Sequence, residues 1–252
     1  MFRILLCLMF LLSTGLQIQA QDSGKSLVSA ARKRAADARN KKGEERKTIL
    51  EDTLRILRMV PEKFPKATPS VARALVETGK VLRRLGRPEE AIVALNRVLE
   101  IPDENRQACE ALHELTSLHR KARKYEEAGQ ALQKIIDGYP QQSRQRAQAL
   151  IRLAGIRRRQ KKTDEAEEAL RRCIKEHGDL WRPVVDAVNA LVALKIREKD
   201  LAAARRLLDS HSKAIDERFT GTAFEQKAKN ALRRMKSRAR LDKVSGATDG
   251  TP

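Results

Sequence analysis

The sequence predicts an all-α protein built from stacked pairs of helices. Charged residues make up 34% of the 252-residue chain and aromatic residues only 3%, and few windows alternate apolar and polar residues as strands do. A small residue follows an acidic pair, with leucine four residues later, in three places, and a fainter copy lacks the acidic pair. The alanines at these four places follow one another at intervals of about 38 residues, at Ala91, Ala128, Ala166 and Ala204. Regular spacing of this kind indicates an array of helical repeats.

Residues 1–20 have the pattern of a secretory signal peptide. Arg3 precedes an apolar run of about 13 residues, and the segment closes on the small residue Ala20. The run is shorter than the roughly 20 residues that a spanning helix needs. We therefore expect cleavage near Ala20 and export, so that the mature protein is periplasmic or secreted; an uncleaved membrane anchor is the alternative. No second apolar run follows, so we expect no transmembrane segment in the mature chain.

Residues 21–46 come next and are rich in alanine and in basic residues, with almost no large apolar side chain. This composition is typical either of a solvated basic arm or of a weakly held N-terminal cap helix. The repeat domain is expected over 47–218. It opens with a helix that carries six aliphatic residues and ends at Phe64-Pro65, so a degenerate first repeat is expected there.

Four repeats follow, and each reads as two amphipathic helices joined by a short turn. In the first of them a helix stops near Gly86, and a second helix ends at Pro102. The apolar stripe of one helix cannot be buried inside a single repeat, so neighbouring repeats must stack. Small residues at the contact let paired helices approach closely. The predicted repeat-packing residues are Gly79, Ala91, Ala128, Ala166 and Ala204.

These positions resemble the tetratricopeptide repeat family, and specifically an exported bacterial-type member. The family pattern has a Leu-Gly pair, an aromatic, a small alanine and a closing proline, and the chain matches it at Gly79, Ala91, Tyr125, Ala128, Pro140 and Ala166. The chain departs from the family in its longer period, which is about 38 residues where the family has about 34. It also has leucine at most of the aromatic places. The resemblance implies an α-α superhelix, a tetratricopeptide-like solenoid of about four to five helical hairpins.

The C-terminal part predicts one further helix and a tail. Residues 219–241 read as a polar-faced capping helix, with Phe224, Ala228, Leu232 and Met235 directed inward. Residues 242–252 are expected to form a disordered tail.

Catalytic and metal-binding patterns are missing from the sequence. It has no glycine-rich phosphate loop and no serine or cysteine nucleophile with a suitably spaced histidine, so we expect no enzyme and no cofactor. Four scattered histidines and three cysteines offer no zinc spacing, so no metal site is expected. Cys109 and Cys173 would remain after cleavage, either as two buried thiols or as one disulfide.

Basic residues recur in the last turn of each first helix. They are Arg83, Arg84, Arg120, Lys121, Arg158, Arg159 and Arg197. Windows that join each first helix to the next carry net charges of +1, +2, +3 and +1, so the following acidic residues do not cancel the basic ones. In the family this end of the first helices borders the concave groove, so the resemblance implies a basic stripe along the groove margin. The alternative is a solvated edge whose cations stabilise the helix dipoles.

The sequence therefore predicts a non-catalytic, exported scaffold that binds a protein partner. The net charge of +20 favours an acidic protein, or an anionic polymer of the cell envelope, as the occupant of the basic stripe. Nucleic acid is the usual inference from such a charge, but export argues against it. The alternative is a cytoplasmic helical-repeat protein that binds nucleic acid through phosphate contacts.

Overall fold

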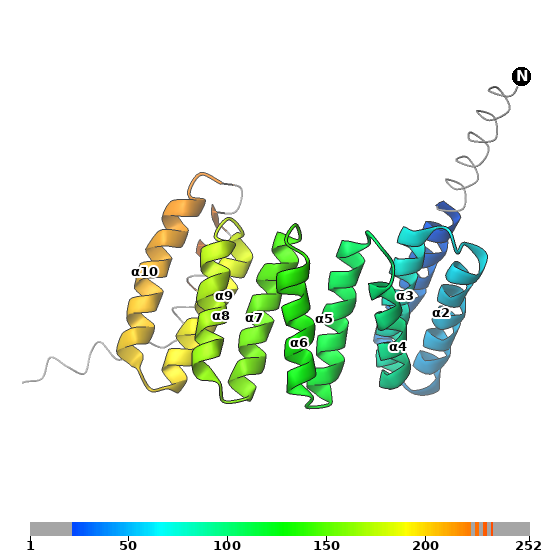
Figure 1. Ribbon diagram of the computed structural model, residues 1–252, viewed down its shortest axis with the longest axis horizontal. Helices are drawn as coiled ribbons and strands as arrows, with labels where there is room; N and C mark the ends of the chain where they lie inside the picture. Colours follow the sequence, from blue (N-terminus) through cyan, green and yellow to red (C-terminus); the bar gives the residue numbers. More distant parts are fainter. Residues whose placement is uncertain (1–21, 223–224, 227–228, 231–232, 234–252) are drawn as a thin grey trace, which may run out of the picture. The chain divides into compact units, whose positions relative to one another are not determined.

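The computed structural model describes residues 22–222, 225–226, 229–230 and 233, and the described elements are all helical (Figure 1). The expected all-α class is confirmed. The chain divides into two compact units after Lys124. The predicted signal peptide over 1–20 and the predicted tail over 242–252 lie outside the described residues, as do Phe224, Ala228, Leu232 and Met235 of the predicted capping helix.

The first unit begins with a helix over 22–37, in the segment for which an arm and a cap helix were the alternatives. Its small apolar side chains Val28, Ala31 and Ala35 are buried. Ion pairs join this helix to the elements that follow it: Arg32 Nη2 lies 2.6 Å from Glu77 Oε1, and Arg34 Nη2 lies 2.8 Å from Asp52 Oδ2. The segment therefore packs as a helix in the structure, and its alanines are what allow the close approach.

The remaining helices of the first unit follow in antiparallel order. They are the 3-10 helix η1 (Ala38–Asn40), α2 (Gly43–Lys63), α3 (Thr68–Leu85), α4 (Pro88–Leu99) and α5 (Asn105–Lys121). Helix α3 packs against α2, α4 and α5. It carries eight buried residues, so it is the central helix of this unit.

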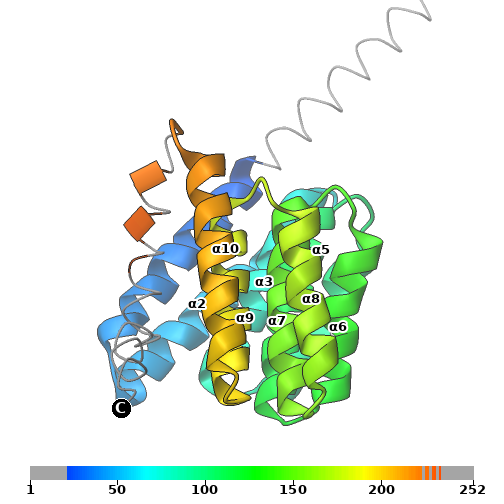
Figure 2. The ribbon, with the colours of Figure 1, turned by 90° about the vertical axis from the view of Figure 1, so that its left-hand side faces the viewer.

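The second unit contains α6 (Tyr125–Gly138), α7 (Ser143–Arg159), α8 (Thr163–Glu176), α9 (Trp181–Arg197) and α10 (Leu201–Phe219). Each of these helices packs against the next, and α7 also packs against α9 (Figure 2). Valines of α9 and apolar residues of α10 form a core cluster that includes Val188, Val192, Leu208 and Phe219. The second unit is thus a row of helices in which the first helices of successive hairpins touch.

The four alanines that set the repeat period occupy the same place in four helices. Each is the fourth residue of its helix, in α4, α6, α8 and α10. Ala91, Ala128, Ala166 and Ala204 have exposed fractions of 0%, 0%, 1% and 0%. Each first turn is therefore buried at the point where the sequence keeps the side chain small.

Gly79 on α3 lies directly against Leu95 on α4. A Cβ atom at this position would lie 2.6 Å from Cγ and Cδ2 of Leu95, which is well inside van der Waals contact. Leu95 itself is fully buried. The absence of a side chain at Gly79 therefore sets the distance between the two helices of this hairpin.

The turns that follow α3, α5, α7 and α9 share one backbone conformation. Each has a residue with left-handed φ just beyond the helix: Gly86 at 77°, Arg123 at 60°, Lys161 at 63° and Lys199 at 63°. The amide of that residue donates to the carbonyl three residues earlier, and the next amide donates to the carbonyl five residues before it, which is the Schellman motif. Glycine adopts this conformation freely, whereas another residue costs roughly 1–2 kcal/mol.

The two described cysteines are free thiols, one in each unit. Cys109 on α5 and Cys173 on α8 are both fully buried. Burial raises the pKa of Cys109 to about 12, and burial together with the charges of Asp186 and Glu176 raises the pKa of Cys173 to about 12. Both thiols are therefore protonated at any physiological pH.

Candidate functional site

Two basic side chains near the end of α3 are paired with neighbouring carboxylates. Arg83, in the last turn of α3, donates from Nε to Glu114 Oε2 on α5 at 3.0 Å. One turn earlier, Lys80 contacts Glu77 on its own helix at 3.1 Å and also Glu110 on α5. Burial alone would lower the pKa of Lys80, but these two carboxylates raise it above its ordinary value. The cations Lys80 and Arg83 are therefore paired within the protein and are not free to bind an anionic ligand.

Arg84 does not lie on the same surface as Arg83. Its Nη1 donates to the backbone carbonyl of Ala35 at 2.9 Å, so its side chain reaches the N-terminal helix. Burial, together with the neighbouring charges of Arg46 and Arg39, lowers the pKa of Arg84. Arg84 is thus a packing residue between helices, although the sequence placed it in the same stripe as Arg83.

Arg120 and Lys121 are exposed at the end of α5. Among the described residues, neither meets a carboxylate within ion-pair distance.

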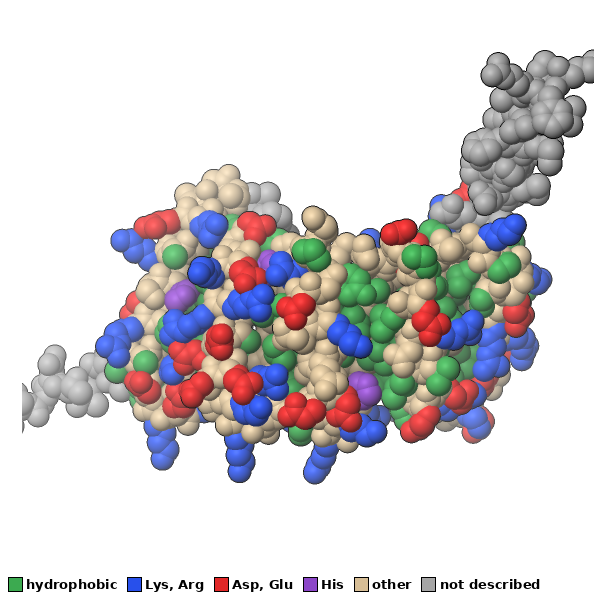
Figure 3. Space-filling view, viewed as in Figure 1, with side chains coloured by type: hydrophobic (Ala, Val, Ile, Leu, Met, Phe, Trp, Pro, Cys, Tyr) green, Lys and Arg blue, Asp and Glu red, His purple; other side chains and the backbone are tan. Residues whose placement is uncertain are grey.

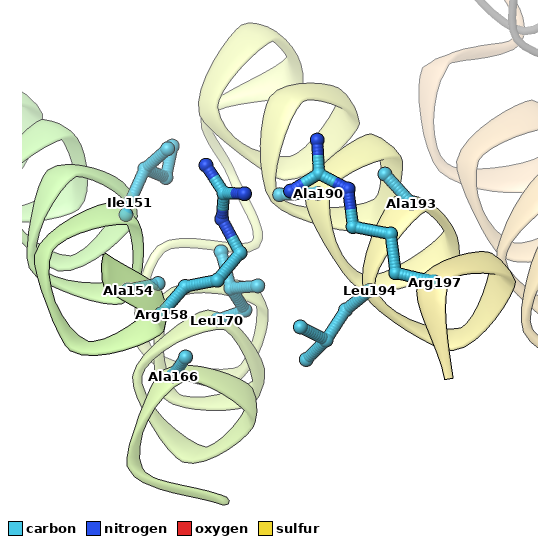
Figure 4. Close-up of a pocket in the computed structure, with 10 residues that line it drawn as sticks. Ile151, Ala154, Arg158, Ala166, Leu170, Ala190, Ala193, Leu194 and Arg197 are labelled. Atoms are coloured by element: carbon cyan, nitrogen blue, oxygen red, sulfur yellow. The ribbon is translucent and has the colours of Figure 1, made fainter. Parts of the chain in front are cut away.

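In the second unit, two stripe residues border one cavity. The cavity has a volume of about 190 Å³ and lies between α7 and α9, with α8 at its base. Arg158 from α7 and Arg197 from α9 turn toward one another across its opening (Figure 4). The rest of the lining is apolar or small and comprises Ile151, Ala154, Gly155, Ala166, Leu170, Ala190, Ala193 and Leu194.

Neither arginine at this cavity has an acidic partner among the residues that the structure describes, and both are exposed. The carboxylates nearby are engaged by other cations. Arg157 lies 3.0 Å from Glu165, and Lys195 lies 2.6 Å from Glu167. On the face shown in Figure 3, acidic side chains are accordingly interspersed among the Lys and Arg side chains.

Arg83 has a carboxylate partner and Arg158 has none among the described residues, because the residue opposite them differs at one repeat position. Arg158 stands two repeats after Arg83 in the sequence, and Ala190 stands two repeats after Glu114. The partner that neutralises Arg83 is therefore replaced by alanine opposite Arg158. The alanine also removes bulk, which leaves the apolar base of the cavity accessible beside the guanidinium groups.

Sequence reasoning found the arginines but missed their partners. The predicted stripe has seven residues, of which the structure brings only Arg158 and Arg197 to a common cavity, while Arg159 is exposed at the adjoining end of α7. Glu77, Glu110 and Glu114 were not singled out. A comparison of the residues at one repeat position, which are Glu77, Glu114, Arg152 and Ala190, would have shown that an acidic residue gives way to alanine.

The described residues contain no group of three or more His, Cys, Asp or Glu side chains placed to hold a metal ion. None of the described helices combines the length and the hydropathy that crossing a bilayer requires.

Models of the tetratricopeptide repeat match residues 56–107, 110–141 and 148–179. No curated protein matches the sequence significantly. The matched segments cover the helices from the end of α2 through α8, which include the cavity-lining residues of α7 and α8.

Solved structures with a similar fold are also tetratricopeptide-like. A putative kinesin light chain from Podosopora anserina has a TM-score of 0.56 at 14% identity, over 87% of this chain and 97% of that one. BtubC from P. vanneervenii has a TM-score of 0.55 at 15% identity, over 88% and 95%. PilF from Pseudomonas aeruginosa has a TM-score of 0.51 at 17% identity, over 88% and 92%. The chain therefore contains tetratricopeptide repeats over the matched residues, and its fold is tetratricopeptide-like.

Proposed function

We propose that the protein is a non-catalytic scaffold that binds an acidic segment of a partner protein. The segment would bind in the cavity between α7 and α9 that Arg158 and Arg197 border, which we call the groove. Tetratricopeptide repeats support a role in protein–protein interaction. The observation that carries the acidic specificity is the pair Arg158 and Arg197, two guanidinium groups without carboxylate partners among the described residues, above an apolar cavity. A carboxylate with an aliphatic or apolar neighbour satisfies both parts of this site.

The energetics favour this occupant over a free anion. Hydrogen bonds to charged groups contribute about 1.5–3 kcal/mol each, and a guanidinium can bind a carboxylate through two parallel bonds. The apolar base adds roughly 25 cal/mol for each Å² that the ligand buries. An acidic residue next to leucine or valine therefore gains from both terms, whereas a small inorganic anion gains only from the first.

A peptide-binding measurement tests the proposal directly. The probe is a labelled peptide that alternates glutamate and leucine, and its affinity is measured by fluorescence anisotropy in about 50 mM salt. Replacing Arg158 and Arg197 with alanine should weaken binding about tenfold or more. The charge-matched control replaces Lys134 and Lys175, which are exposed on α6 and α8, and should change the affinity by less than about threefold.

A second variant tests the groove without removing either arginine. Ala190→Glu places a carboxylate where α5 has Glu114, so it should pair with Arg158 and prevent peptide binding. Glu114→Ala is the reciprocal change and should free Arg83 in the first unit. Peptide affinity that survives both Ala190→Glu and the double arginine change would rule out this groove.

We also propose that this scaffold acts after export, with residues 1–20 removed near Ala20. The support is the basic and apolar pattern at the N-terminus and the scarcity of apolar runs elsewhere. An envelope location would bring the basic surface close to acidic proteins and anionic polymers.

The alternative function, binding of nucleic acid in the cytoplasm, is favoured by the net charge of +20. It requires a steep loss of affinity for any DNA or RNA as salt is raised, because binding would depend on phosphate contacts. The scarcity of aromatic residues leaves little base stacking for single strands. Equal affinity for a duplex and for the acidic peptide, with equal salt dependence, would favour this alternative.

A further inference from the structure

The turns at one end of the second unit carry lysines in a conformation that glycine prefers. Lys161 lies in the turn between α7 and α8, and Lys199 lies in the turn between α9 and α10, each with φ of 63°. In the first unit, the turn after α3 has Gly86 in the same conformation with the same pair of hydrogen bonds, and the turn after α5 has Arg123. The backbone therefore needs no side chain at these positions, and lysine is present in spite of the strain.

Both lysines extend from the same edge of the second unit. The first helices α7 and α9 pack side by side and run in the same direction, so their C-terminal turns lie at one end (Figures 1 and 2). On the face shown in Figure 3, isolated Lys and Arg side chains project beyond this edge into solvent. We define the turn edge as Arg159, Lys161 and Lys199, all of which are exposed.

The charges of the turn edge are not used inside the protein. Among the described residues, none of the three side chains forms an ion pair, whereas Lys162, next to Lys161, and Lys195, one helical turn before Lys199, do. None of the three lines the cavity between α7 and α9, and the large apolar side chain exposed near them is Leu201, at 41%. An apolar side chain of a peptide would therefore find little to bind here.

We propose that the turn edge is a second binding surface, separate from the groove, and that it binds a linear polymer of phosphate groups. An exposed lysine is a point charge in water, and one ion pair between it and a single carboxylate of a protein contributes little binding free energy. A polymer of high linear charge density instead releases condensed counterions when cations approach it, so its affinity rises with each contact. A row of projecting cations without apolar surface suits that ligand better than it suits an acidic protein.

The test uses the difference between glycine and lysine at a left-handed position. The variant Lys161→Gly, Lys199→Gly removes two charges and relieves the strain of both turns, so its Tm should stay the same or rise by about two to four degrees. Its affinity for inorganic polyphosphate, measured by calorimetry in about 50 mM salt, should fall about tenfold. The slope of log affinity against log salt should become shallower by about 1.4, at roughly 0.7 per lost contact.

Lys134→Ala, Lys175→Ala is the control with the same change in net charge, and both residues are exposed away from the turns. It should lower polyphosphate affinity less than about threefold. An equal loss in the control would show that net charge alone attracts the polymer and would overturn the proposal. So would an unchanged affinity in the glycine variant.

Two further measurements test whether the turn edge is distinct from the groove, and whether it prefers polyphosphate to an acidic polypeptide. Ala190→Glu, which should close the groove, should leave polyphosphate affinity within about twofold. Polyglutamate is the third probe, and the glycine variant should bind it much as the unchanged protein does. If polyglutamate loses as much affinity as polyphosphate, the turn edge is a surface for acidic proteins and the proposal is wrong.

Discussion

Gly79 shows how one missing side chain sets the packing of a hairpin. Because a Cβ at this position would lie 2.6 Å from two atoms of the buried Leu95, the helices must separate to accept even alanine. We expect Gly79→Ala to lower the free energy of unfolding by about 1–3 kcal/mol, the usual cost of overpacking. Denaturant unfolding followed by circular dichroism measures it.

The control for that change is Gly155→Ala on α7. A Cβ at Gly155 meets no atom within 4 Å, and the position is inside a helix. The same substitution should therefore stabilise the protein by about 0.5–1 kcal/mol, because alanine favours the helix more than glycine does. If both variants lose stability equally, the contact with Leu95 is not the reason.

His177, at the end of α8, contacts the start of α7. Its side chain is buried, with an exposed fraction of 2%. Its Nδ1 lies 3.0 Å from Ser143 Oγ, and its Nε2 is buried without a hydrogen-bond partner among the described residues. Burial lowers the pKa of His177, and the positive charge of Arg146 lowers it further, against the opposing charges of Glu176 and Asp179. The neutral ring is thus the form that the fold accepts.

Stability should consequently decrease as the solution becomes more acidic. The unfolded chain takes up a proton near pH 6.5 while the folded one does not, so stability falls as pH drops below that value, until the lower folded pKa is reached. One proton limits the slope to about 1.4 kcal/mol per pH unit. Melting curves between pH 7.5 and 5.5 measure the effect, and His177→Asn should flatten the slope. A slope that the variant leaves intact would assign the pH dependence to other groups.

At the same scale, sequence alone could locate cations but not their neutralisation. Arg83 and Arg158 occupy the same repeat position, yet one has Glu114 opposite it and the other has Ala190. Which residue lies opposite depends on the contact between two first helices of different repeats, and charges counted along one turn do not contain that information. The counted windows are positive in every repeat, although Lys80 and Arg83 of α3 are paired with carboxylates in the structure.

Among the helices, α10 is held at its N-terminus by a side chain. Asp200 accepts a hydrogen bond from the amide of Ala203 at 2.8 Å, whereas the N-cap residue of α8, Lys162, offers no such bond. Asp200→Ala should therefore lower the free energy of unfolding by about 1 kcal/mol. Lys162→Ala, at the equivalent position, should change it by less than about 0.5 kcal/mol. Equal effects in thermal melts would contradict the role of the cap.

Helix ends were predictable where proline or glycine marks them. The helices end near Phe64-Pro65, Gly86 and Pro102 as expected from the sequence. The later turns within hairpins have no glycine at this position. Their left-handed residues are Arg123, Lys161 and Lys199. Periodicity located these turns, but their backbone conformation could not be read from residues that normally avoid it.

The N-terminal helix was the hardest element to predict. Residues 21–46 lack large apolar side chains, so their composition fits a solvated arm as well as a cap helix. Small residues suffice in the structure: Val28, Ala31, Ala35 and Ala38 are buried, and ion pairs to Glu77 and Asp52 hold the basic face. A composition rule cannot distinguish alanines that pack from alanines that are solvated.

At the scale of the whole chain, the proposed export has a direct test. The protein isolated from its natural source should begin at Gln21, as determined by N-terminal sequencing or intact mass, because cleavage is expected after Ala20. Replacing Ala20 with a large charged residue should block processing. A natural protein that begins at Met1 would refute cleavage and would favour the cytoplasmic alternative.

The burial of the two cysteines gives each unit its own reporter of unfolding. Cys109 belongs to the first unit and Cys173 to the second, and both thiols are fully buried, with pKa values of about 12. An alkylating reagent can therefore modify either thiol only when the surrounding helices open. Mass spectrometry of the two cysteine-containing peptides would measure the rate of each opening separately. Different modification rates would mean that one half of the chain loosens before the other.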